Sequence, residues 1–414
     1  MYNCLVERND EGRGKMKTIS AKCPVCTDKQ TECLLYRAQV PVHQNMICQV
    51  QEDAVNIKRG DLAIRICGRC GFVFNEAFDP ALMSYDQHYN NSQNYSSVFS
   101  GYTGSLAQSI VRQTAGKPET TIIEVGCGKG SFLHQLFDLD DRLTGYGFDP
   151  SYDGPEKAFD GRLGFIKDLY GPKYEHIPAD IVVCRHVIEH IPDPVGLLST
   201  VRKALRNSPQ ARVFFETPCI EWIFNHHAVW DFFYEHCSYF SAASLTKAFQ
   251  QAGFKTEQIS HVFNGQYLWL EASLNADNPA KTFDLAGDPL SDTVQVVEAA
   301  RQYRQQENNT MNRWRELFHL TLAEGPLAIW GAGAKGVTFA QLFDPERTHI
   351  SCIVDINPNK QGQYLPGTGH PIVHCRDLPD LGIRNVILMN PNYKTEVQHL
   401  LAEHELPVNL MELE

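Results

Sequence analysis

The 414-residue sequence lacks any apolar run approaching the roughly 20 residues that a helix needs to cross a bilayer. Residues 1–20 are polar and mixed in charge, without the apolar core of a secretory signal peptide. Positive charge is scarce as well, with 37 Lys and Arg against 49 Asp and Glu and a formal net charge of -12. We therefore expect a cytoplasmic protein with neither a membrane nor a nucleic acid as its partner.

Internal repetition is also missing. No segment recurs with a period of about 20 to 50 residues, which argues against a solenoid, and there is no low-complexity tract. Residues 1–20 carry charge and glycine but no periodic apolar pattern, so we expect a disordered leader. The chain as a whole is 43% hydrophobic, which suffices for more than one core, and its length favours two or three domains.

Strand-like and helix-like stretches alternate over most of the chain. In residues 86–275 the apolar runs are separated by helix-length segments, a rhythm typical of a doubly wound parallel sheet. The runs that we expect to form strands are 121–125, 144–148, 181–184 and 212–215. Residues 323–414 repeat the rhythm on a smaller scale. The predicted fold class is therefore α/β with a central and a C-terminal Rossmann-like domain.

The segment between these two units, residues 276–322, has a different character. Apolar side chains recur at helical spacing among many Gln, Arg and Glu. This pattern predicts a linker containing a long amphipathic helix, which would pack either within the chain or against a second copy.

Residues 21–85 contain two Cys-x-x-Cys turns, Cys23 with Cys26 and Cys67 with Cys70. Four thiolates can surround one zinc ion tetrahedrally and leave no open coordination position, so we predict a structural zinc-binding domain. The alternative is a set of unrelated reduced cysteines. We expect the thirteen cysteines of the chain to supply thiols and this metal site and not a disulfide framework.

A glycine-rich turn follows the first expected strand of the central unit, with glycines at Gly126, Gly128 and Gly130. Glycines let the backbone approach a ligand closely, and the next helix offers its N-terminus to a negative group. Dinucleotide sites use the same logic, but Glu124 just before the turn is typical of class I S-adenosylmethionine methyltransferases. Asp149 ends the next strand, where a carboxylate can accept hydrogen bonds from two ribose hydroxyls.

Two further segments carry ionisable side chains. His186 and His190 follow an expected strand at the ligand-facing edge of the sheet, but no glutamate comes directly after His186, so the zinc-protease pattern fails. Glu235 and His236 lie in the aromatic run 230–240, which a buried strand would also produce by packing alone. Packing does not explain adjacent ionisable groups. A histidine beside a carboxylate is suited to removing a proton next to a carbonyl.

The C-terminal unit opens with a second glycine turn, 331–336, which alone would suggest NAD. Lys335 in the turn and Lys360 after the next strand instead offer cations for a pyrophosphate. From Asp355 to Thr368 the chain then reads Asp-Ile-Asn-Pro-Asn-Lys-Gln-Gly-Gln-Tyr-Leu-Pro-Gly-Thr.

With these residues assembled, nearly the whole chain after residue 20 resembles the sugar C-methyltransferases of tetronitrose and mycarose type. The cysteine pairs resemble the family's zinc domain, Glu124 to Gly130 its cofactor loop, and residues 355–368 the signature of its C-terminal domain. The resemblance implies S-adenosylmethionine and structural zinc as cofactors. It also implies a dTDP- or GDP-linked 4-keto-6-deoxy sugar as substrate, C-methylated at ring carbon 3.

The resemblance assigns roles to single residues, with His236 as the base and Glu235 beside it. The family reads Tyr-His-Glu-His where this chain reads Phe233-Tyr234-Glu235-His236, which points to a different sugar stereochemistry or a shifted role for Tyr234. The expected catalytic residues are His236, Glu235, Tyr234 and His186. The expected cofactor contacts are Tyr95, Glu124, Gly126, Gly128, Gly130, Asp149, Asp168, Arg185 and His186. The expected substrate contacts are His190, Lys335, Asp355, Asn357, Lys360, Tyr364 and Pro366.

Several alternatives stay open. Asp168 is equally compatible with a helix cap and Tyr95 with an exposed loop tyrosine. An O- or N-methyltransferase acting on a sugar or small metabolite would keep the cofactor loop but need no base for a carbon acid. A protein that only binds nucleotides would need neither the cofactor loop nor the base. The sequence leaves the nucleotide, the methylated face of the ring and the oligomeric state undetermined.

Overall fold

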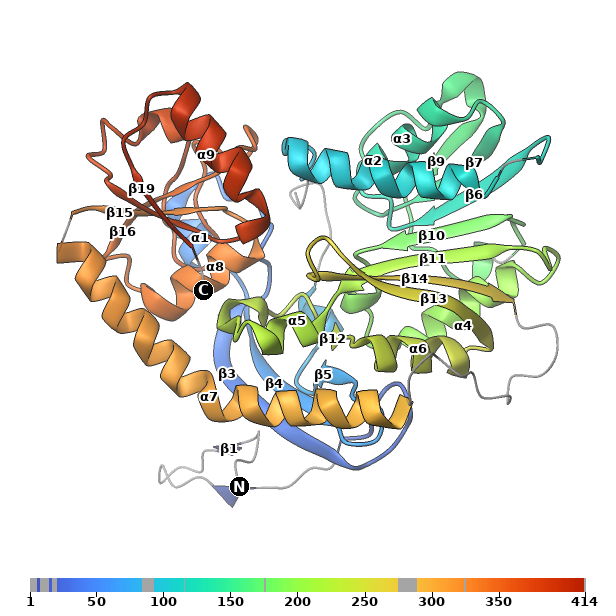
Figure 1. The fold of residues 1–414 in the computed structure, drawn as a ribbon, viewed down its shortest axis with the longest axis horizontal. Helices are drawn as coiled ribbons and strands as arrows, with labels where there is room; N and C mark the ends of the chain where they lie inside the picture. Colours follow the sequence, from blue (N-terminus) through green and yellow to red (C-terminus); the bar gives the residue numbers. More distant parts are fainter. Residues whose placement is uncertain are drawn as a thin grey trace.

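The computed structural model describes residues 21–83, 93–274 apart from 115 and 175, and 289–412 apart from 324, together with the short strands β1 (Val6–Glu7) and β2 (Lys15–Met16). Apart from β1 and β2, which pair antiparallel, the expected disordered leader lies outside the described residues, as do the junction near residue 86 and the start of the expected linker. The described chain forms three parts, with the N-terminal module between and below two α/β units (Figure 1). Within the described residues no helix is long and apolar enough to cross a membrane.

The N-terminal module is a small antiparallel sheet. Its own strands are β3 (Thr31–Pro41), β4 (Arg59–Cys67) and β5 (Val73–Asn75), with the short helices α1 (Gln51–Val55) and η1 (Pro80–Leu82). The fourth strand, β12 (Ser238–Tyr239), comes from the central unit and pairs with β5, giving the order β12-β5-β4-β3. The alternating pattern of Leu62, Ile64 and Ile66 buries these side chains completely or nearly so. The module therefore shares one sheet with the central unit.

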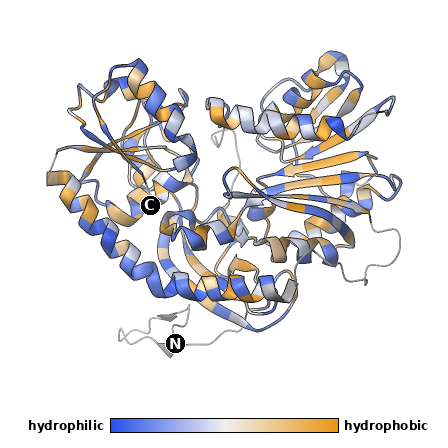
Figure 2. Ribbon diagram, in the orientation of Figure 1, coloured by the Kyte–Doolittle hydropathy of each residue, from blue (hydrophilic) through white to orange (hydrophobic). Residues whose placement is uncertain are grey.

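The central unit is built on an eight-stranded sheet of order β13-β14-β11-β10-β6-β7-β9-β8. Its strands are β6 (Thr120–Val125), β7 (Leu143–Phe148), β8 (Lys157–Ala158), β9 (Leu163–Ile166), β10 (Ile181–Arg185), β11 (Arg212–Pro218), β13 (Phe254–Val262) and β14 (Tyr267–Leu274). All four expected strands are present. The inner strands run parallel and are apolar on both faces, whereas β14 is antiparallel to β11. Figure 2 shows these strands as the most hydrophobic part of the unit.

Helices cover both faces of this sheet. They are α2 (Ser97–Arg112), α3 (Ser131–Leu139), α4 (Pro194–Ala204), α5 (Ile220–Asn225) and α6 (Ala242–Gln251), with the short turns η2 (Phe159–Gly161), η3 (Pro172–Tyr174), η4 (Ile188–His190) and η5 (Val229–Asp231). The strand order reverses at β6, on either side of which lie β7 and β10. Ligands of doubly wound sheets bind outside the carboxyl ends of the strands at such a reversal.

The C-terminal unit has a five-stranded parallel sheet of order β17-β16-β15-β18-β19. Its elements are β15 (Leu327–Trp330), α8 (Ala334–Phe343), β16 (Ile350–Val354), β17 (Ile372–Val373), η6 (Cys375–Asp377), β18 (Asn385–Leu388), η7 (Pro391–Tyr393), α9 (Lys394–Glu403) and β19 (Asn409–Glu412). The order reverses at β15, so this sheet also has a ligand-binding edge at the glycine turn after β15.

The helix α7 (Pro289–Ala323) joins the two units along the underside of the molecule (Figure 1). Its buried stripe packs against the N-terminal module and the C-terminal unit, and includes Val297, Ala300, Tyr303, Trp314 and Phe318. The ion pairs Arg37–Glu307 at 2.7 Å and Arg301–Glu32 at 2.6 Å tie it to β3. The linker helix therefore packs within the chain, which is the first of the two arrangements that the sequence left open.

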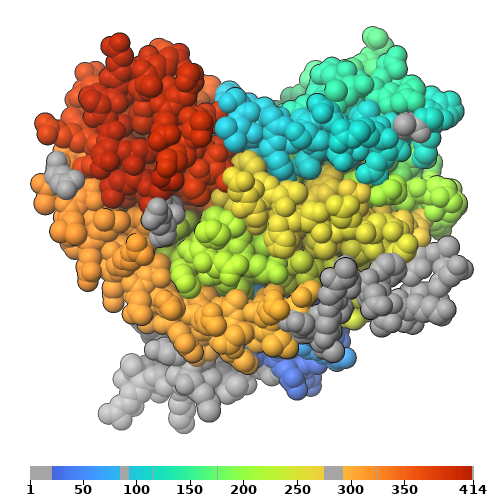
Figure 3. Space-filling model, in the orientation of Figure 1, coloured from blue at the N-terminus to red at the C-terminus, as the bar shows by residue number. Residues whose placement is uncertain are grey.

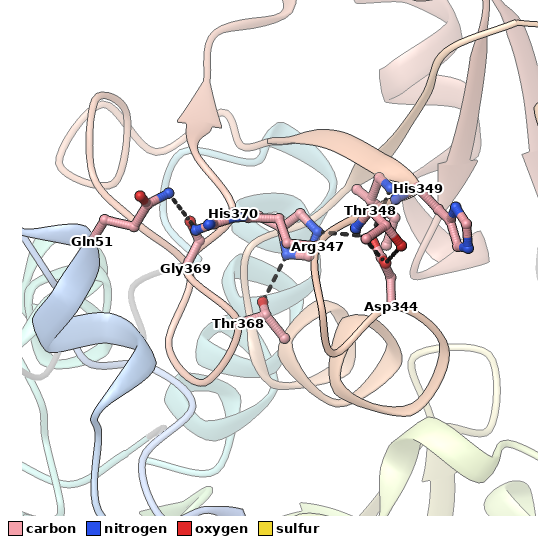
Figure 4. Close-up of polar contacts among 9 residues, drawn as sticks. Gln51, Asp344, Arg347, Thr348, His349, Thr368, Gly369 and His370 are labelled. Carbon is pink, nitrogen blue, oxygen red and sulfur yellow. Dashed lines mark hydrogen bonds and ion pairs between the residues drawn. The ribbon is translucent and has the colours of Figure 1, made fainter.

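A buried polar cluster fixes the loop between β16 and β17 (Figure 4). The fully buried His370 hydrogen-bonds through Nδ1 to the Thr368 hydroxyl at 2.7 Å and through Nε2 to the Asp344 carboxylate at 3.1 Å. Asp344 also accepts hydrogen bonds from the backbone amides of residues 348 to 350. Gln51 of the N-terminal module donates to the carbonyl of Gly369 at 2.9 Å. The cluster therefore holds the C-terminal signature loop against α1.

Candidate active site and structural metal centre

The four predicted zinc ligands lie together at the edge of the N-terminal module. Their sulfur atoms are all within 4.8 Å of one another, with Cys23 Sγ to Cys70 Sγ at 3.6 Å and Cys26 Sγ to Cys67 Sγ at 3.5 Å. Zinc–sulfur bonds of about 2.3 Å in a tetrahedron place sulfurs about 3.8 Å apart, so the four thiols fit zinc. They belong to the eleven cysteines that are free within the described part of the chain, and Cys33 is disulfide-bonded.

The central glycine turn has the shape that its sequence requires. Gly126 and Gly130 have φ angles of 73° and 79°, and a Cβ atom on them would lie 2.1 Å from Val187 and 2.6 Å from Phe165. Gly128, with φ of 55°, has no atom within 4 Å of the Cβ position. The outer glycines are thus needed for close packing, and the middle one leaves open space beside the backbone where a ligand can approach.

Two carboxylates flank this turn at the carboxyl ends of β6 and β7. Glu124 is buried, and its Oε2 atom has no hydrogen-bond partner among the described residues. Burial raises the pKa of Glu124 to about 8, although Arg185 nearby opposes the shift. Asp149 accepts hydrogen bonds from the amides of Gly128 and Ser151, both at 2.8 Å. An unpartnered buried oxygen beside an open glycine fits the cationic methionine end of S-adenosylmethionine.

A buried ion pair follows β10. The Arg185 guanidinium donates to Glu216 at 2.6 Å and stacks 4.5 Å over the ring of Phe132, while its Nη2 atom has no partner among the described residues. Tyr102 also donates to Glu216, and His186 lies 3.5 Å from the same carboxylate. The network fixes His186, which has a positive φ of 54°, at the edge of the sheet.

Asp168 is partly exposed. It pairs with Lys173, accepts a hydrogen bond from the Tyr174 hydroxyl at 2.9 Å, and accepts another from the amide of Leu169. Leu169 is the next residue and does not begin a helix, so these bonds do not make Asp168 a helix cap. A contact to the adenine stays a prediction.

A cavity of about 260 Å³ lies between the carboxyl edges of the two parallel sheets. All three parts of the chain line it. The predicted residues that it brings together are Tyr95, His186, His190, Glu235, His236, Lys335, Asp355, Asn357 and Lys360. The glycine turn 331–336 and the residue Phe233 also face it.

The histidine pair of this cavity is held from behind. His190 Nδ1 lies 2.8 Å from the carbonyl oxygen of Glu235, which makes it a donor and leaves its other nitrogen toward the cavity. The ring of His236 lies edge-on to His190 with centroids 4.8 Å apart and 4.2 Å from Phe233. Burial, with His190 and His186 nearby, lowers the pKa of His236 well below its usual range. His236 is therefore neutral at pH 7 and able to accept a proton.

Glu235 is held by backbone amides of the N-terminal module. Its Oε1 atom accepts hydrogen bonds from the backbone amides of Gln44 at 2.6 Å and Asn45 at 3.3 Å. Both donors belong to the N-terminal module. The module thus orients the turn that carries His236.

The structure places Tyr234 elsewhere than the sequence led us to expect. Its fully buried ring packs on Gly60, where a Cβ atom would lie 2.3 Å away, and its hydroxyl accepts a hydrogen bond from the amide of Asp79 at 2.8 Å. Tyr234 lies in the turn that follows Phe233, and the two side chains point to different sides: Phe233 faces the cavity and Tyr234 faces the module core. We therefore remove Tyr234 from the expected catalytic set.

The C-terminal wall of the cavity carries two lysines with different partners. Lys335 donates to the buried Asp231 at 2.8 Å and lies 4.5 Å over the ring of Trp222. The buried Lys360 donates to the carbonyl of Ala332 at 2.9 Å, and burial lowers its pKa. Lys335 thus lies beside Asp231 at the start of α8, whereas Lys360 shapes the glycine turn.

Two expected substrate contacts do not line the cavity. Tyr364 pairs its amide with the carbonyl of Cys48 at 2.9 Å, and Pro366 is buried in the loop that the His370 cluster fixes. Asp355 and Asn357 do reach the cavity, because they come directly after β16. The second half of the signature therefore docks the C-terminal unit on the N-terminal module.

The start of α2 bridges the central and C-terminal units. Glu396 of α9 accepts hydrogen bonds from the Ser96 hydroxyl at 2.7 Å and the Ser97 amide at 2.6 Å, which caps α2. Tyr95 accepts one from Asn359 at 2.9 Å. Figure 1 shows the N-terminal end of α2 beside α9. In Figure 3 the red C-terminal unit abuts the cyan and yellow segments below an open notch. The segment closes one side of the cavity.

Sequence reasoning missed several cavity residues, namely Asn45, Trp222, Gln266, Tyr267 and Asn390. Gln266 and Asn390 exchange hydrogen bonds at 2.8 and 3.1 Å across the two α/β units. The position of Asn390 after β18 was predictable, because strand carboxyl ends bind ligands in such folds. Asn45 carries no local signal.

Two other clusters have metal-like donors among the described residues. Glu189, His190 and His236 hold ligand atoms within 4.8 Å of one another, as do Cys219, Glu221 and His261. In the second cluster Glu221 already caps α6 by accepting from the amide of Ala242 at 3.0 Å. Only the cysteine set has the four matched donors of a structural zinc site.

Comparisons with known proteins agree with this geometry. Residues 100–259 match the model of a methyltransferase domain, and residues 291–405 match that of a C-methyltransferase C-terminal domain. The C-methyltransferase NovU of Streptomyces niveus is 22% identical over 85% of this chain and 85% of its own length. A ubiquinone biosynthesis O-methyltransferase of Pseudoalteromonas translucida is 26% identical but aligns with 26% of this chain and 48% of its own.

Solved structures show a weaker likeness over less than half of the chain. The calicheamicin-biosynthesis methyltransferase CalO1 is 16% identical over 43% of this chain and 55% of its own, with a TM-score of 0.32. The magnesium protoporphyrin IX methyltransferase ChlM of Synechocystis is 16% identical over 43% and 84%, with a TM-score of 0.34.

The family models, the strand order and the glycine turn with its acidic neighbours together define an S-adenosylmethionine-dependent methyltransferase of the class I fold. The C-terminal domain match, and the 22% identity to NovU over 85% of the chain, make this methyltransferase similar to the C-methyltransferases.

Proposed function

We propose that this enzyme transfers a methyl group to carbon 3 of a nucleotide-diphosphate-linked 4-keto-6-deoxy sugar, in deoxysugar biosynthesis. The observation that carries the proposal is the neutral, cavity-facing His236, set between the methyltransferase sheet edge and the C-terminal glycine turn. A carbon acid next to a ketone needs such a base, whereas methyl transfer to oxygen or nitrogen does not.

The two ends of the cavity suit the two ends of this substrate. The N-terminus of α8 with Lys335 offers backbone amides and a cation to a diphosphate. The opposite end carries His186, His190 and His236. We place the keto sugar against the histidines and the diphosphate against α8, with Asp355 and Asn357 on the nucleoside side.

The chemistry assigned to this chain's residues is short. S-adenosylmethionine supplies an electrophilic methyl group when bound between Glu124, Asp149 and the glycine turn. His236 takes the proton from carbon 3, and the electron pair left behind forms the enolate of the neighbouring ketone. His190, whose Nδ1 hydrogen is committed to the Glu235 carbonyl, helps to hold the sugar in line with the methyl group. His186 faces the same space from the cofactor side.

Phe233 offers no hydrogen bond to the enolate oxygen. The proposal therefore predicts that the enolate oxygen faces other donors of the cavity and not residue 233, which differs from the family pattern.

The test is an assay with isotopically labelled S-adenosylmethionine and a panel of dTDP- and GDP-linked 4-keto-6-deoxy sugars, read by mass and carbon NMR. A methyl group on ring carbon 3, with solvent deuterium exchange at that carbon without methyl donor, supports the proposal and names the nucleotide. Label on oxygen or nitrogen would establish the alternative O- or N-methyltransferase. Label on a different ring carbon would overturn the assigned position.

A further inference from the structure

The N-terminal module sends one side chain into the cavity. Asn45 follows β3 in a stretch whose neighbours His43 and Gln44 are also buried, and it is itself only 4% exposed. Gln44 anchors the stretch by donating from its side chain to the carbonyl of Pro41 at 2.6 Å. The zinc-binding part of the chain is thus a wall of the active site.

The side-chain oxygen of Asn45 lacks a hydrogen-bond partner within the part of the chain that the structure describes. This Oδ1 atom is buried, and a buried amide oxygen without a donor is costly. The backbone amide of Asn45, by contrast, is used by Glu235 at 3.3 Å. The side chain is therefore positioned but unsatisfied, which is the condition of a group that a ligand completes.

The position of Asn45 in the cavity indicates which part of a bound ligand its side chain would contact. Its Oδ1 lies 3.9 Å from the Cβ position on Gly333, in the turn before α8, and its backbone lies on the turn that carries His236. In a sugar whose carbon 1 bears the diphosphate and whose carbon 3 faces His236, carbon 2 lies between them. Asn45 sits between the same two landmarks.

We propose that Asn45 binds the substituent on carbon 2 and selects nucleotide sugars with a hydroxyl there over their 2-deoxy counterparts. This inference rests on the proposed function. A hydroxyl can donate to the amide oxygen and accept from the amide nitrogen, whereas a methylene leaves the amide unpaired in a buried site. A site built to pair a hydroxyl discriminates strongly against the analogue that lacks it.

The test compares matched 2-hydroxy and 2-deoxy 4-keto-6-deoxy sugars, on the nucleotide that the panel identifies, in wild type, Asn45→Ala and Asn45→Asp. We expect wild type to favour the 2-hydroxy sugar by about 100-fold in kcat/KM and Asn45→Ala to reduce that preference to below about 10-fold. Asn45→Asp, which keeps an acceptor, should retain more of the preference. The affinity for S-adenosylmethionine and the zinc content should stay unchanged.

Tyr36→Phe serves as a matched control, because Tyr36 is an exposed residue of the same module whose hydroxyl donates to Asp61 at 2.8 Å, away from the cavity lining. It should keep the wild-type preference. Equal turnover of both sugars by wild type, or an unchanged preference in Asn45→Ala, would overturn the role of Asn45 and leave the C-methylation intact. No methylation of any keto sugar by wild type would instead overturn the proposed function.

Discussion

The carboxylate of Glu235 accepts a hydrogen bond at 2.6 Å from the backbone amide of Gln44, a residue 191 positions earlier in the chain. This bond joins the zinc-binding module to the residue next to the proposed base. The strand β12, which pairs with β5 of the module, begins three residues after Glu235. The N-terminal module therefore positions the proposed base, although it contains none of the sequence motifs that were assigned to the cofactor or the substrate.

Loss of zinc from the N-terminal module should reduce turnover at the active site. Cys67→Ser should lower the metal content from about one zinc per chain toward none and reduce turnover at least tenfold, because the module that orients Glu235 loses its metal cross-link. Metal analysis by mass spectrometry, with Cys352→Ala as a buried control far from the cluster, checks this. Two zinc ions per wild-type chain would show that one of the two other donor sets also binds metal.

Replacing the proposed base should affect chemistry and not binding. His236→Asn should lower kcat by about 10²- to 10⁴-fold, the usual contribution of a general base, with the affinity for S-adenosylmethionine retained in calorimetry. Because burial lowers the pKa of His236, the acid limb of the wild-type kcat/KM profile should fall below pH 6.5. Near wild-type turnover in the variant would remove His236 from the mechanism.

Cofactor binding should release a proton. Burial raises the pKa of Glu124 to about 8, so the group is mostly protonated at pH 7 in the free protein. The positive charge of S-adenosylmethionine favours the carboxylate, so binding at pH 7 should release close to one proton per chain. Calorimetry in buffers of different ionisation enthalpy measures this number. Glu124→Gln should bind more weakly and release none.

Tyr234→Phe should change stability and leave catalysis unaffected. Loss of the hydroxyl that accepts from the Asp79 amide should cost about 1 kcal/mol, while kcat stays within about twofold of wild type because the ring faces the module core. Denaturant unfolding and steady-state kinetics separate the two effects. A large loss of kcat with unchanged KM would return Tyr234 to the catalytic set.

The His370 cluster should make the C-terminal unit sensitive to acid. Burial would raise the pKa of Asp344, but the hydrogen bonds from His370 and three backbone amides lower it well below the usual range. The carboxylate therefore stabilises the fold above about pH 4, and this contribution is lost as the pH falls below that value. Asp344→Asn should cost about 3 kcal/mol at pH 7 and flatten the acid dependence of unfolding, measured by circular dichroism.

The parts of the fold that follow local rules were predictable. Apolar runs ending at Val125, Phe148 and Cys184 became inner strands because only a sheet covered on both faces buries such runs. The apolar stripe of α7 likewise predicted its buried face. In the same way, the two Cys-x-x-Cys turns brought four sulfurs together because their geometry is set by short turns at the ends of paired strands.

What the sequence could not predict depends on contacts between distant segments. The direction of Tyr234 follows from the pairing of β12 with β5, and no local pattern encodes that pairing. Asn45 reaches the cavity only because the C-terminal unit docks beside the N-terminal module. Tyr364 and Pro366 belong to a strongly recognisable motif, yet they serve that docking and do not line the cavity.

The borrowed strand also has a consequence for how the protein is made. The edge of β5 emerges from the ribosome long before Ser238, so the N-terminal sheet exposes unpaired backbone groups during most of the synthesis of the central unit. A nascent chain in this state is open to pairing with a neighbouring copy. Truncation consequently cannot separate the N-terminal module from the central unit cleanly. Removing the central unit takes away β12 and leaves β5 unpaired, and removing the module leaves β12 without its partner.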